Sequence, residues 1–179
     1  PLRTRFLEAG MRVLARDGYA GFKQSAVCSE TGLTTGAFYH SFRKWKAFED
    51  ELIAYWRSES TEQLVAWVEA LPSPAGRIDA LVDVALALPH QTEAAIRIWA
   101  AGDAAVGRAV AEVDAMRTAA VTRAFQEIGV DGDHAQRLAA AAMLMLVGHE
   151  CSNSSIETLE WSMRHSLETD PQVRAAIGG

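Results

Sequence analysis

A short run of residues beginning at Thr34 carries side chains suited to contact DNA. Thr34 and Thr35 offer hydroxyls that can bond phosphates or bases, and their methyl groups can meet a thymine methyl. Gly36 has no side chain, so the backbone at this point can approach DNA closely. On a short helix starting at Thr35, the residues able to reach the floor of a groove are Thr35, Gly36, Ala37 and His40. The run therefore predicts a recognition helix.

The residues before this run are typical of a helix-turn-helix motif. Residues 24–31 are long enough for two helical turns, and Gly32 follows them at a position where a left-handed backbone is common. Thr34 can then cap a new helix that begins near Thr35. The second helix of such a motif usually enters the DNA major groove, and a plain helical corner is the alternative. The apolar positions expected to form the shared core of the two helices are Val27, Leu33 and Phe38.

The charge of the chain is unevenly distributed. The net charge is −6 at pH 7, which by itself argues against nucleic acid as a partner. Residues 1–48, however, carry eight basic and three acidic side chains, a balance of +5, so the rest of the chain carries −11. This basic segment places a favourable field at the helix-turn-helix. Lys23, Gln24 and Ser25 begin its first helix, whose N-terminal amides can meet a phosphate.

The whole sequence predicts an all-α protein. Apolar residues make up 49% of the chain, alanine is frequent and β-branched runs are absent. No run approaches the ~20 apolar residues of a membrane span. Cys28 and Cys151 lie far apart, give no disulfide framework and fit a reducing cytoplasm. Capping residues and helical spacing predict helices near residues 2–17, 24–31, 59–71, 75–88, 92–101, 103–128, 131–151 and 155–168, with two more beginning near residues 35 and 43.

A set of positions within residues 5–56 follows one family pattern. The matching positions are Gly18-Tyr19, Val27-Cys28, Thr31-Gly32-Leu33-Thr34, Gly36, Phe38-Tyr39 and Phe42. In these positions the chain resembles the TetR family of bacterial transcriptional regulators, and the run from Thr31 to Phe42 is the most specific part. The resemblance implies a helix-turn-helix DNA-binding domain of three helices at residues 1–46 and a helical ligand-binding and dimerisation domain at residues 47–179.

The resemblance places Tyr39 and His40 on DNA phosphates. The chain departs from the family pattern at the start of the motif, because Lys23 stands where the family often has threonine and Ser25 where it often has arginine. It departs again at the start of the next helix, where a serine or asparagine cap followed by lysine is usual.

In this chain, Lys44 stands at the position of the cap and Trp45 at the position of the lysine that follows it. Phosphate contacts there can come instead from Arg43, Lys44 or Lys46, and the choice among them stays open at this point. The predicted DNA-binding residues are Lys23, Gln24, Ser25, Thr34, Thr35, Gly36, Ala37, Tyr39, His40, Lys44 and Lys46.

One helix-turn-helix contacts too few base pairs to select an operator in double-stranded DNA. A two-fold homodimer would place two recognition helices ~34–36 Å apart on a palindromic site. The resemblance assigns dimerisation to the last two long helices, near residues 133–151 and 155–168. Small residues between 138 and 148 allow close helix packing, although a buried helix of a monomer would have the same composition.

The predicted effector is a small, mainly hydrophobic molecule, because no rich set of charges lines the C-terminal helices. It would release a repressor from DNA by favouring a conformer whose recognition helices are wrongly spaced. Ordinary core packing is the alternative for each candidate residue. The candidate ligand-binding residues are Trp67, Trp99, Met116, Phe125, Met143 and His149.

Two other classes of function, an enzyme and a protein-interaction module, fit the sequence less well. An enzyme would have to use His149-Glu150-Cys151, but neighbours on a helix point about 100° apart and these side chains diverge. No phosphate loop, nucleotide fingerprint or zinc spacing is present, so the sequence predicts no cofactor, no metal and no catalysis. The second alternative is a helical protein-interaction module with a degenerate DNA-binding head, which the departures at Lys23, Ser25 and Trp45 allow.

Overall fold

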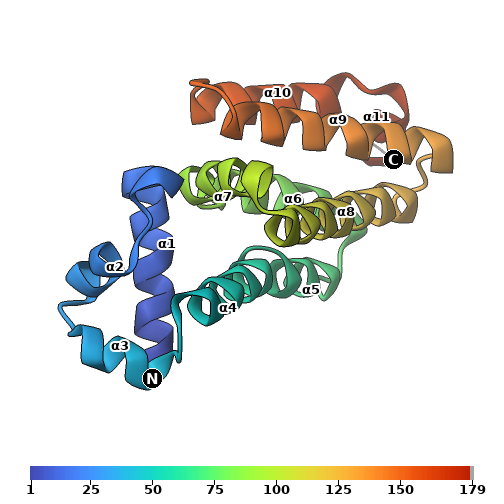
Figure 1. Cartoon of the computed structure of the whole chain (residues 1–179). Helices are drawn as coiled ribbons and strands as arrows, with labels where there is room; N and C mark the ends of the chain where they lie inside the picture. The colour runs from blue at the N-terminus through green and yellow to red at the C-terminus, as the bar shows by residue number, and fades with distance from the viewer. Residues whose placement is uncertain (178–179) are drawn as a thin grey trace. The chain divides into compact units, whose positions relative to one another are not determined.

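The computed structural model describes residues 1–177 as helices joined by short turns, without a strand in that range (Figure 1). This confirms the predicted all-α class. The last two residues of the predicted C-terminal domain, 178 and 179, lie outside the described part. No helix in residues 1–177 has the length and apolar character to cross a membrane. The elements are α1 (Leu2–Gly21), α2 (Gln24–Thr31), α3 (Thr35–Ser41), α4 (Trp45–Arg57), the π-helical turn η1 (Ser58–Glu62), α5 (Gln63–Glu69), α6 (Pro74–Ala87), α7 (His90–Gly102), α8 (Ala104–Glu127), α9 (Gly132–Glu150), α10 (Ile156–Thr169) and α11 (Pro171–Ile177).

The chain folds as two units, each assembled from separate segments. The first unit combines residues 1–60 with residues 89–111, so it contains α1 to α4, α7 and the start of α8. The second unit combines residues 61–88 with the chain from residue 112 onward, which gives it α5, α6, the rest of α8 and α9 to α11. The functional division at residue 46 stays a prediction, because these units are defined by packing alone.

An aromatic cluster forms the core of the first unit. Phe38 of α3 lies at its centre, with ring centroids 5.4 Å from Phe6 of α1, 5.3 Å from Phe42 and 5.3 Å from Phe48 of α4. All four rings are essentially buried. Gly10 lets α1 and α4 approach, because a Cβ at this position would lie 2.9 Å from the Phe48 ring. The cluster therefore fixes the recognition helix against α1 and α4.

Helix α1 extends beyond its predicted end. Gly18 has φ 66° and ψ −176°, a non-helical conformation that interrupts α1, and one further turn then runs to Gly21. The helix predicted near residues 2–17 ends at this kink and misses the last turn. The extra turn carries Tyr19, whose ring stacks on Trp99 of α7 at 5.2 Å, and it is followed by Phe22, whose ring lies 5.3 Å from Trp99. Packing against α7 thus stabilises a turn that sequence spacing alone did not indicate.

Two hydrogen bonds, one buried and one partly buried, hold α7 within the first unit. The hydroxyl of Thr92 donates to the carbonyl of Met11 in α1 at 3.1 Å. The indole N–H of Trp56 in α4 donates to Oε1 of Glu93 at 2.9 Å, and both of these side chains are almost fully buried. A carboxylate removed from water costs free energy unless it is hydrogen-bonded, so the Trp56 indole helps α7 retain Glu93 in this core.

The helix predicted at residues 59–71 is not a separate element. The chain passes from α4 through the π-helical turn η1 into α5 without a break, and Leu71 lies beyond the end of α5. No glycine or proline lies between Trp45 and Glu69, so no residue terminates the helix there. The π-helical turn η1 therefore connects α4 to α5 directly.

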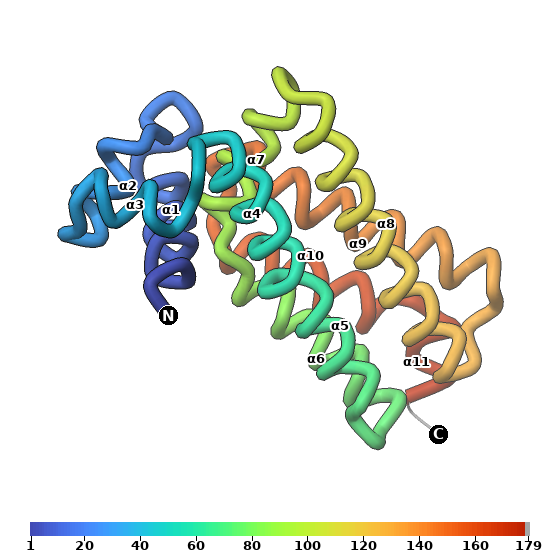
Figure 2. The backbone as a smooth tube through the Cα atoms, turned by 60° about the horizontal axis from the view of Figure 1, so that its bottom comes forward, coloured from blue at the N-terminus to red at the C-terminus, as the bar shows by residue number. Residues whose placement is uncertain are grey.

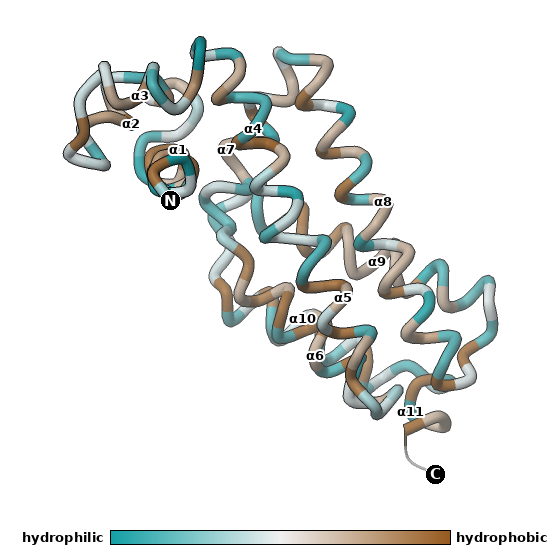
Figure 3. The backbone as a smooth tube through the Cα atoms, turned by 90° about the horizontal axis from the view of Figure 1, so that it is seen from below, coloured by the Kyte–Doolittle hydropathy of each residue, from teal (hydrophilic) through white to brown (hydrophobic). Residues whose placement is uncertain are grey.

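The second unit buries two apolar clusters. In the first, Ile78 of α6, Phe125 of α8 and Val173 of α11 pack together with Ala124, Val130 and Ala135. In the second, Val82, Leu88, Leu146, Leu159 and Met163 join α6 to α9 and α10. Figure 2 shows α5 beside α6, and Figure 3 shows hydrophobic and hydrophilic residues recurring in short stretches along these amphipathic helices.

Helix α11 was not predicted. Pro171 begins it, and Oδ1 of Asp170 accepts from the backbone N–H groups of Gln172 and Val173 at 3.0 Å each. Oδ2 of Asp170 also lies 2.7 Å from Nε2 of His134 in α9. A capping aspartate followed by proline is a helix start signal, but seven residues are too few to show helical periodicity.

The turn between α2 and α3 has the predicted geometry. Gly32 is left-handed, with φ 67° and ψ 18°, and the Leu33 N–H donates to the Cys28 carbonyl at 3.2 Å. The Thr34 hydroxyl oxygen accepts from the Ala37 N–H at 3.2 Å, which caps α3. Sequence reasoning therefore located both the turn and the cap.

Replacing Gly32 with valine should lower the stability of the first unit by about 1–2 kcal/mol, because a left-handed backbone is strained for a side chain with a Cβ. A Cβ at Gly32 would meet nothing within 4 Å, so any loss measures backbone strain rather than a clash. Gly102→Val is the matched control, since that site is also open but lacks a positive φ. Thermal unfolding of both variants checks this, and equal melting temperatures would contradict the assigned turn.

Candidate nucleic-acid interface

Helix α3 presents one buried and one exposed face. Phe38 and Ser41 point into the first unit, while Thr35, Tyr39 and His40 are exposed. Thr34 and Gly36 are also exposed, and Ala37 is half-buried. Because the aromatic cluster holds Phe38, the positions on the opposite side of this short helix face solvent. The structure thus brings the predicted residues of α3 together on one accessible surface.

The first residues of α2 lie next to α3. Lys23 precedes the helix in an extended conformation, and its carbonyl accepts from the N–H groups of Ala26 and Val27 at 3.0 and 3.1 Å. Lys23 and Ser25 are exposed, whereas Gln24 is half-buried. The Tyr39 hydroxyl donates to Oε1 of Gln24 at 3.3 Å, so the two helices of the motif meet at this pair.

The connection between α3 and α4 carries three basic residues in different environments. Arg43 and Lys44 are exposed, and Lys44 is the residue that precedes α4. Nζ of Lys46 lies 3.0 Å from Oδ1 of Asp50 and 3.6 Å from Oδ2 of Asp103. The hydrogen bond that Lys46 donates to Asp50 raises the pKa of Lys46, and the charge of Lys46 is therefore already compensated within the protein.

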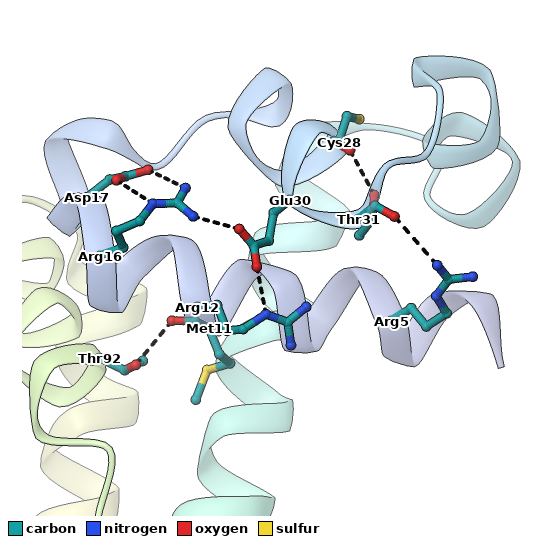
Figure 4. A network of polar contacts seen from close by, with 9 residues as sticks. All are labelled: Arg5, Met11, Arg12, Arg16, Asp17, Cys28, Glu30, Thr31 and Thr92. Atoms are coloured by element: carbon teal, nitrogen blue, oxygen red, sulfur yellow. Dashed lines mark hydrogen bonds and ion pairs between the residues drawn. The ribbon is translucent and has the colours of Figure 1, made fainter.

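Several other basic side chains of residues 1–46 are also occupied. Arg3 pairs with Glu51, and Glu30 holds both Arg12 and Arg16 (Figure 4). In contrast, within residues 1–177 no carboxylate lies within ion-pair distance of Lys23, Arg43 or Lys44, three exposed cations flanking α2 and α3. The positive charge that forms no ion pair therefore lies beside the exposed face of the recognition helix.

The ion pairs of Glu30 join α2 to α1. Nε of Arg12 lies 2.8 Å from Oε1 of Glu30, and an Arg16 guanidinium nitrogen lies 2.6 Å from Oε2 (Figure 4). Arg16 also pairs with Asp17 at 2.8 Å. The hydrogen bonds from Arg12 and then Arg16 lower the pKa of Glu30 below its ordinary value of 4.5.

A lowered carboxyl pKa makes this contribution to stability depend on pH. It is fully present above about pH 4.5, the value for the unfolded chain, and is lost as the pH falls through the lower pKa of the folded state. We expect the melting temperature of Glu30→Gln to be below that of the wild type at pH 7 and to converge with it at acid pH. Glu8→Gln is the control, because Glu8 is exposed on α1 and forms no ion pair with the described residues. A gap independent of pH would show that the charge of Glu30 is not responsible.

The six residues predicted to bind a ligand lie in several environments. Trp99 belongs to the first unit, where it is buried against Tyr19 and Phe22. In the second unit, Phe125 is buried in the cluster around Ile78, and Met143 packs on the other cluster.

The other three candidates differ in exposure. Trp67 of α5 is 54% exposed, whereas Met116 of α8 is half-buried. His149 is half-buried at the end of α9, with Nδ1 3.1 Å from the Ser154 hydroxyl. Their common role in ligand binding stays a prediction.

The second unit also has an open pocket of about 490 Å³ that sequence reasoning missed. Residues of α11 help to line it, and that helix carried too little periodicity to be predicted. It combines aliphatic side chains with two arginines and two carboxylates. Its lining residues are Ile78, Asp79, Arg164, Leu167, Glu168, Val173, Arg174 and Ile177.

The chain is similar to known proteins both in its N-terminal sequence and in its fold. Residues 6–46 match the family model described as bacterial regulatory proteins, tetR family. No curated protein sequence matches the chain. A transcriptional regulator from Rhodococcus sp. Rha1 is 18% identical with a TM-score of 0.75, over 99% of this chain and 96% of that chain. A putative TetR-family transcriptional regulator from Rhodococcus sp. is 14% identical with a TM-score of 0.73, over 98% of each chain.

A third structure, of a putative transcriptional regulator from Saccharomonospora viridis in complex with choline, is 18% identical, with a TM-score of 0.73 over 94% of this chain and 96% of that chain. At these identities the likeness establishes a shared fold, and the match over residues 6–46 adds the recognition motif. Members of this family are DNA-binding transcription factors and not enzymes. Residues 6–46 therefore carry a helix-turn-helix that matches the TetR family of bacterial regulators, with its recognition helix exposed, and the whole chain shares its fold with solved transcriptional regulators.

Proposed function

We propose that this protein is a one-component repressor that acts in the cytoplasm. As a homodimer it binds a palindromic operator in double-stranded DNA through two helix-turn-helix motifs. A small, mainly hydrophobic effector binds the C-terminal helical domain, residues 47–179, and releases the protein from DNA. DNA binding is thus assigned to residues 1–46 and effector binding to residues 47–179, as the predicted boundary implies.

The exposed face of α3 is the observation that carries the proposal. Thr35 and His40 are exposed there and can hydrogen-bond to DNA, with Lys23 beside α2 and Arg43 and Lys44 after α3. Phosphate contacts position a protein on the duplex, and groove contacts select the sequence. We assign the phosphate contacts at the α3–α4 turn to Arg43 and Lys44. Lys46 is assigned to holding α4 next to Asp103, because two carboxylates already engage it.

The dimer is proposed to form through α9 and α10, which pack against each other in the second unit (Figure 1). Leu144 of α9 is 75% exposed and Trp161 of α10 is 65% exposed. The Trp161 ring stacks on His165 at 4.7 Å, which holds it in place on the surface. Large apolar side chains left in water favour contact with a partner surface, and a second copy of the chain is the partner proposed here.

The pair of substitutions Leu144→Asp and Trp161→Asp should convert the dimer to monomers, because each places a charge at an apolar contact. Operator affinity should fall when the dimer dissociates, since the two recognition helices then no longer bind DNA together. Sedimentation equilibrium measures the mass. Ile98→Asp is the control, as Ile98 is 65% exposed on α7 in the first unit. A dimer that survives the double substitution would place the interface elsewhere.

The effector is proposed to be apolar because its candidate residues include aromatic rings and thioethers and no carboxylate. The regulator from Saccharomonospora viridis was solved with choline, a cation. Aromatic faces can also bind cations, so choline is the informative competitor. A ligand that binds the folded state raises the melting temperature by mass action. We expect aromatic hydrocarbons or uncharged aromatic molecules, and not choline, to produce this shift and to release DNA.

A gel-shift on the DNA upstream of the protein's own gene tests the repressor proposal. The dimer should retard this DNA at low salt and lose affinity steeply as salt rises. An effector that shifts the melting temperature should reverse the retardation. If dimeric protein retards no fragment even at low salt, the protein-interaction alternative becomes the better description.

A further inference from the structure

Gln24 and Tyr39 form a side-chain pair at the edge of the recognition helix. The Tyr39 hydroxyl donates to Oε1 of Gln24 at 3.3 Å, which joins the first residue of α2 to α3. The Tyr39 side chain is half in solvent, with 50% of its surface exposed. The other end of the Gln24 amide differs, since Nε2 is buried and has no hydrogen-bond partner.

The direction of this hydrogen bond conflicts with a phosphate contact by Tyr39. A phenol has a single O–H to donate, and phosphate oxygens at neutral pH only accept. While the Tyr39 hydroxyl donates to Gln24, it has no hydrogen left for a phosphate. The bond is also long for an O–H···O contact, which is usually about 2.7–2.8 Å, so little is lost when it exchanges.

A half-turn of the Gln24 amide removes this conflict. The rotation exchanges the positions of Oε1 and Nε2, so Nε2 would donate to the Tyr39 hydroxyl oxygen. The Tyr39 O–H would then be free to donate outward. The rotation also gives the orphaned Nε2 an acceptor and moves the oxygen to the buried position, and buried oxygens lacking a partner are less rare than buried N–H groups.

We propose that Gln24 is a positioning residue that turns the Tyr39 hydroxyl into a phosphate donor. On DNA, Nε2 of Gln24 donates to Tyr39, and Tyr39 donates to a phosphate oxygen. In free protein the hydroxyl donates to Oε1 of Gln24. The proposal rests on the proposed DNA-binding function and adds a role for Gln24 that needs no direct contact with DNA.

A double-substitution cycle on the full-length dimer tests this coupling. The probe is a fluorescein-labelled duplex that the wild-type chain selects from a random-sequence library. Each substitution acts in both subunits, so Gln24→Met and Tyr39→Phe should each weaken binding roughly a hundredfold, about tenfold for each hydrogen bond to a charged group. The double variant should bind no more weakly than Tyr39→Phe alone, because Gln24 acts only through the hydroxyl.

Gln24→Glu gives an independent measurement. A carboxylate can only accept, so it would hold the Tyr39 hydroxyl turned inward. Its loss of affinity should be larger in the wild-type background than with Tyr39→Phe, where only charge repulsion remains. Gln91→Met, at an exposed site in the first turn of α7, should leave binding unchanged. Neither Gln24→Met nor Tyr39→Phe should alter the salt dependence, because neither removes a charge.

The outcomes distinguish a failure of the Gln24–Tyr39 coupling from a failure of the proposed DNA-binding function. If the losses for Gln24→Met and Tyr39→Phe multiply in the double variant, Gln24 acts independently and the proposed coupling is wrong. The coupling is also wrong if Gln24→Glu costs the same in both backgrounds. If the wild-type chain selects no duplex at low salt, the DNA-binding function itself fails.

Discussion

Replacing Lys23, Arg43 and Lys44 together with methionine is expected to abolish operator binding at physiological salt and leave the fold intact. These three exposed cations form no ion pair with the described residues, so the substitutions remove only the longer-range attraction between Lys23 and Asp17. A dimer would lose six phosphate contacts, and the slope of log affinity against log salt should fall by about 5. Fluorescence anisotropy at 50–200 mM salt measures both the affinity and the slope.

A charge-matched control distinguishes local contacts from net charge. Arg108, Arg137 and Arg174 are exposed and lie outside residues 1–46. Their joint replacement by methionine removes the same charge from the chain. We expect the salt slope to be nearly unchanged in this variant. Equal losses in the two triple variants would show that the overall field, and not these three contacts, drives binding.

Phe38→Ala is expected to destabilise the first unit by about 3–5 kcal/mol, the usual cost of removing a buried aromatic ring. Phe38 is fully buried, and its ring contacts Phe6, Phe42 and Phe48 from α1, the end of α3 and α4. No flexible side chain of this cluster can fill the space. Urea unfolding gives the loss of free energy, and DNA binding should disappear with the fold of the motif.

Hydrogen exchange shows where the loss occurs. Phe38→Ala should accelerate amide exchange in α1 to α3, whereas Phe125→Ala should do so in the second unit, where Phe125 is buried. Phe38→Leu should cost less than the alanine variant, because most of the apolar volume remains. Acceleration spread evenly over both units by either variant would contradict the separate packing of the two units.

The helix-turn-helix was predictable because its signals are local. Gly32 and Thr34 act through their own backbone or a neighbour three residues away, so sequence spacing indicates their roles. The resemblance to the TetR family followed from the same stretch of residues. The exposed face of α3 followed as well, since burying Phe38 leaves only one face of a seven-residue helix for solvent.

The charge network was not predictable, because its partners are distant in sequence. Arg12 and Arg16 count toward the positive charge of residues 1–48, yet both are held by Glu30 of α2. Lys46 approaches Asp103, more than fifty residues away. Only the packing of helices decides which cations stay free, so a count of basic residues overstates the charge that DNA meets.

The aromatic residues show the same limit. Trp99 was predicted as part of a ligand site, and spacing cannot tell a cavity wall from a core position. Its ring lies between α7 and the end of α1, against Tyr19 and Phe22, and its role in ligand binding stays a prediction. Contacts with Trp99 stabilise the extra turn of α1 after Gly18, and these contacts cannot be predicted from the spacing of neighbouring residues.

The packing of α7 against α1 limits how this protein can be taken apart. A fragment ending at residue 46 would keep the whole DNA-binding motif but would strip Trp99 from Tyr19 and Phe22, and Thr92 from the Met11 carbonyl. Grafting this specificity onto another regulator therefore requires α7 to be transplanted along with residues 1–60. A natural recombination event at the motif boundary would meet the same obstacle, so the portable module of this protein is discontinuous in sequence.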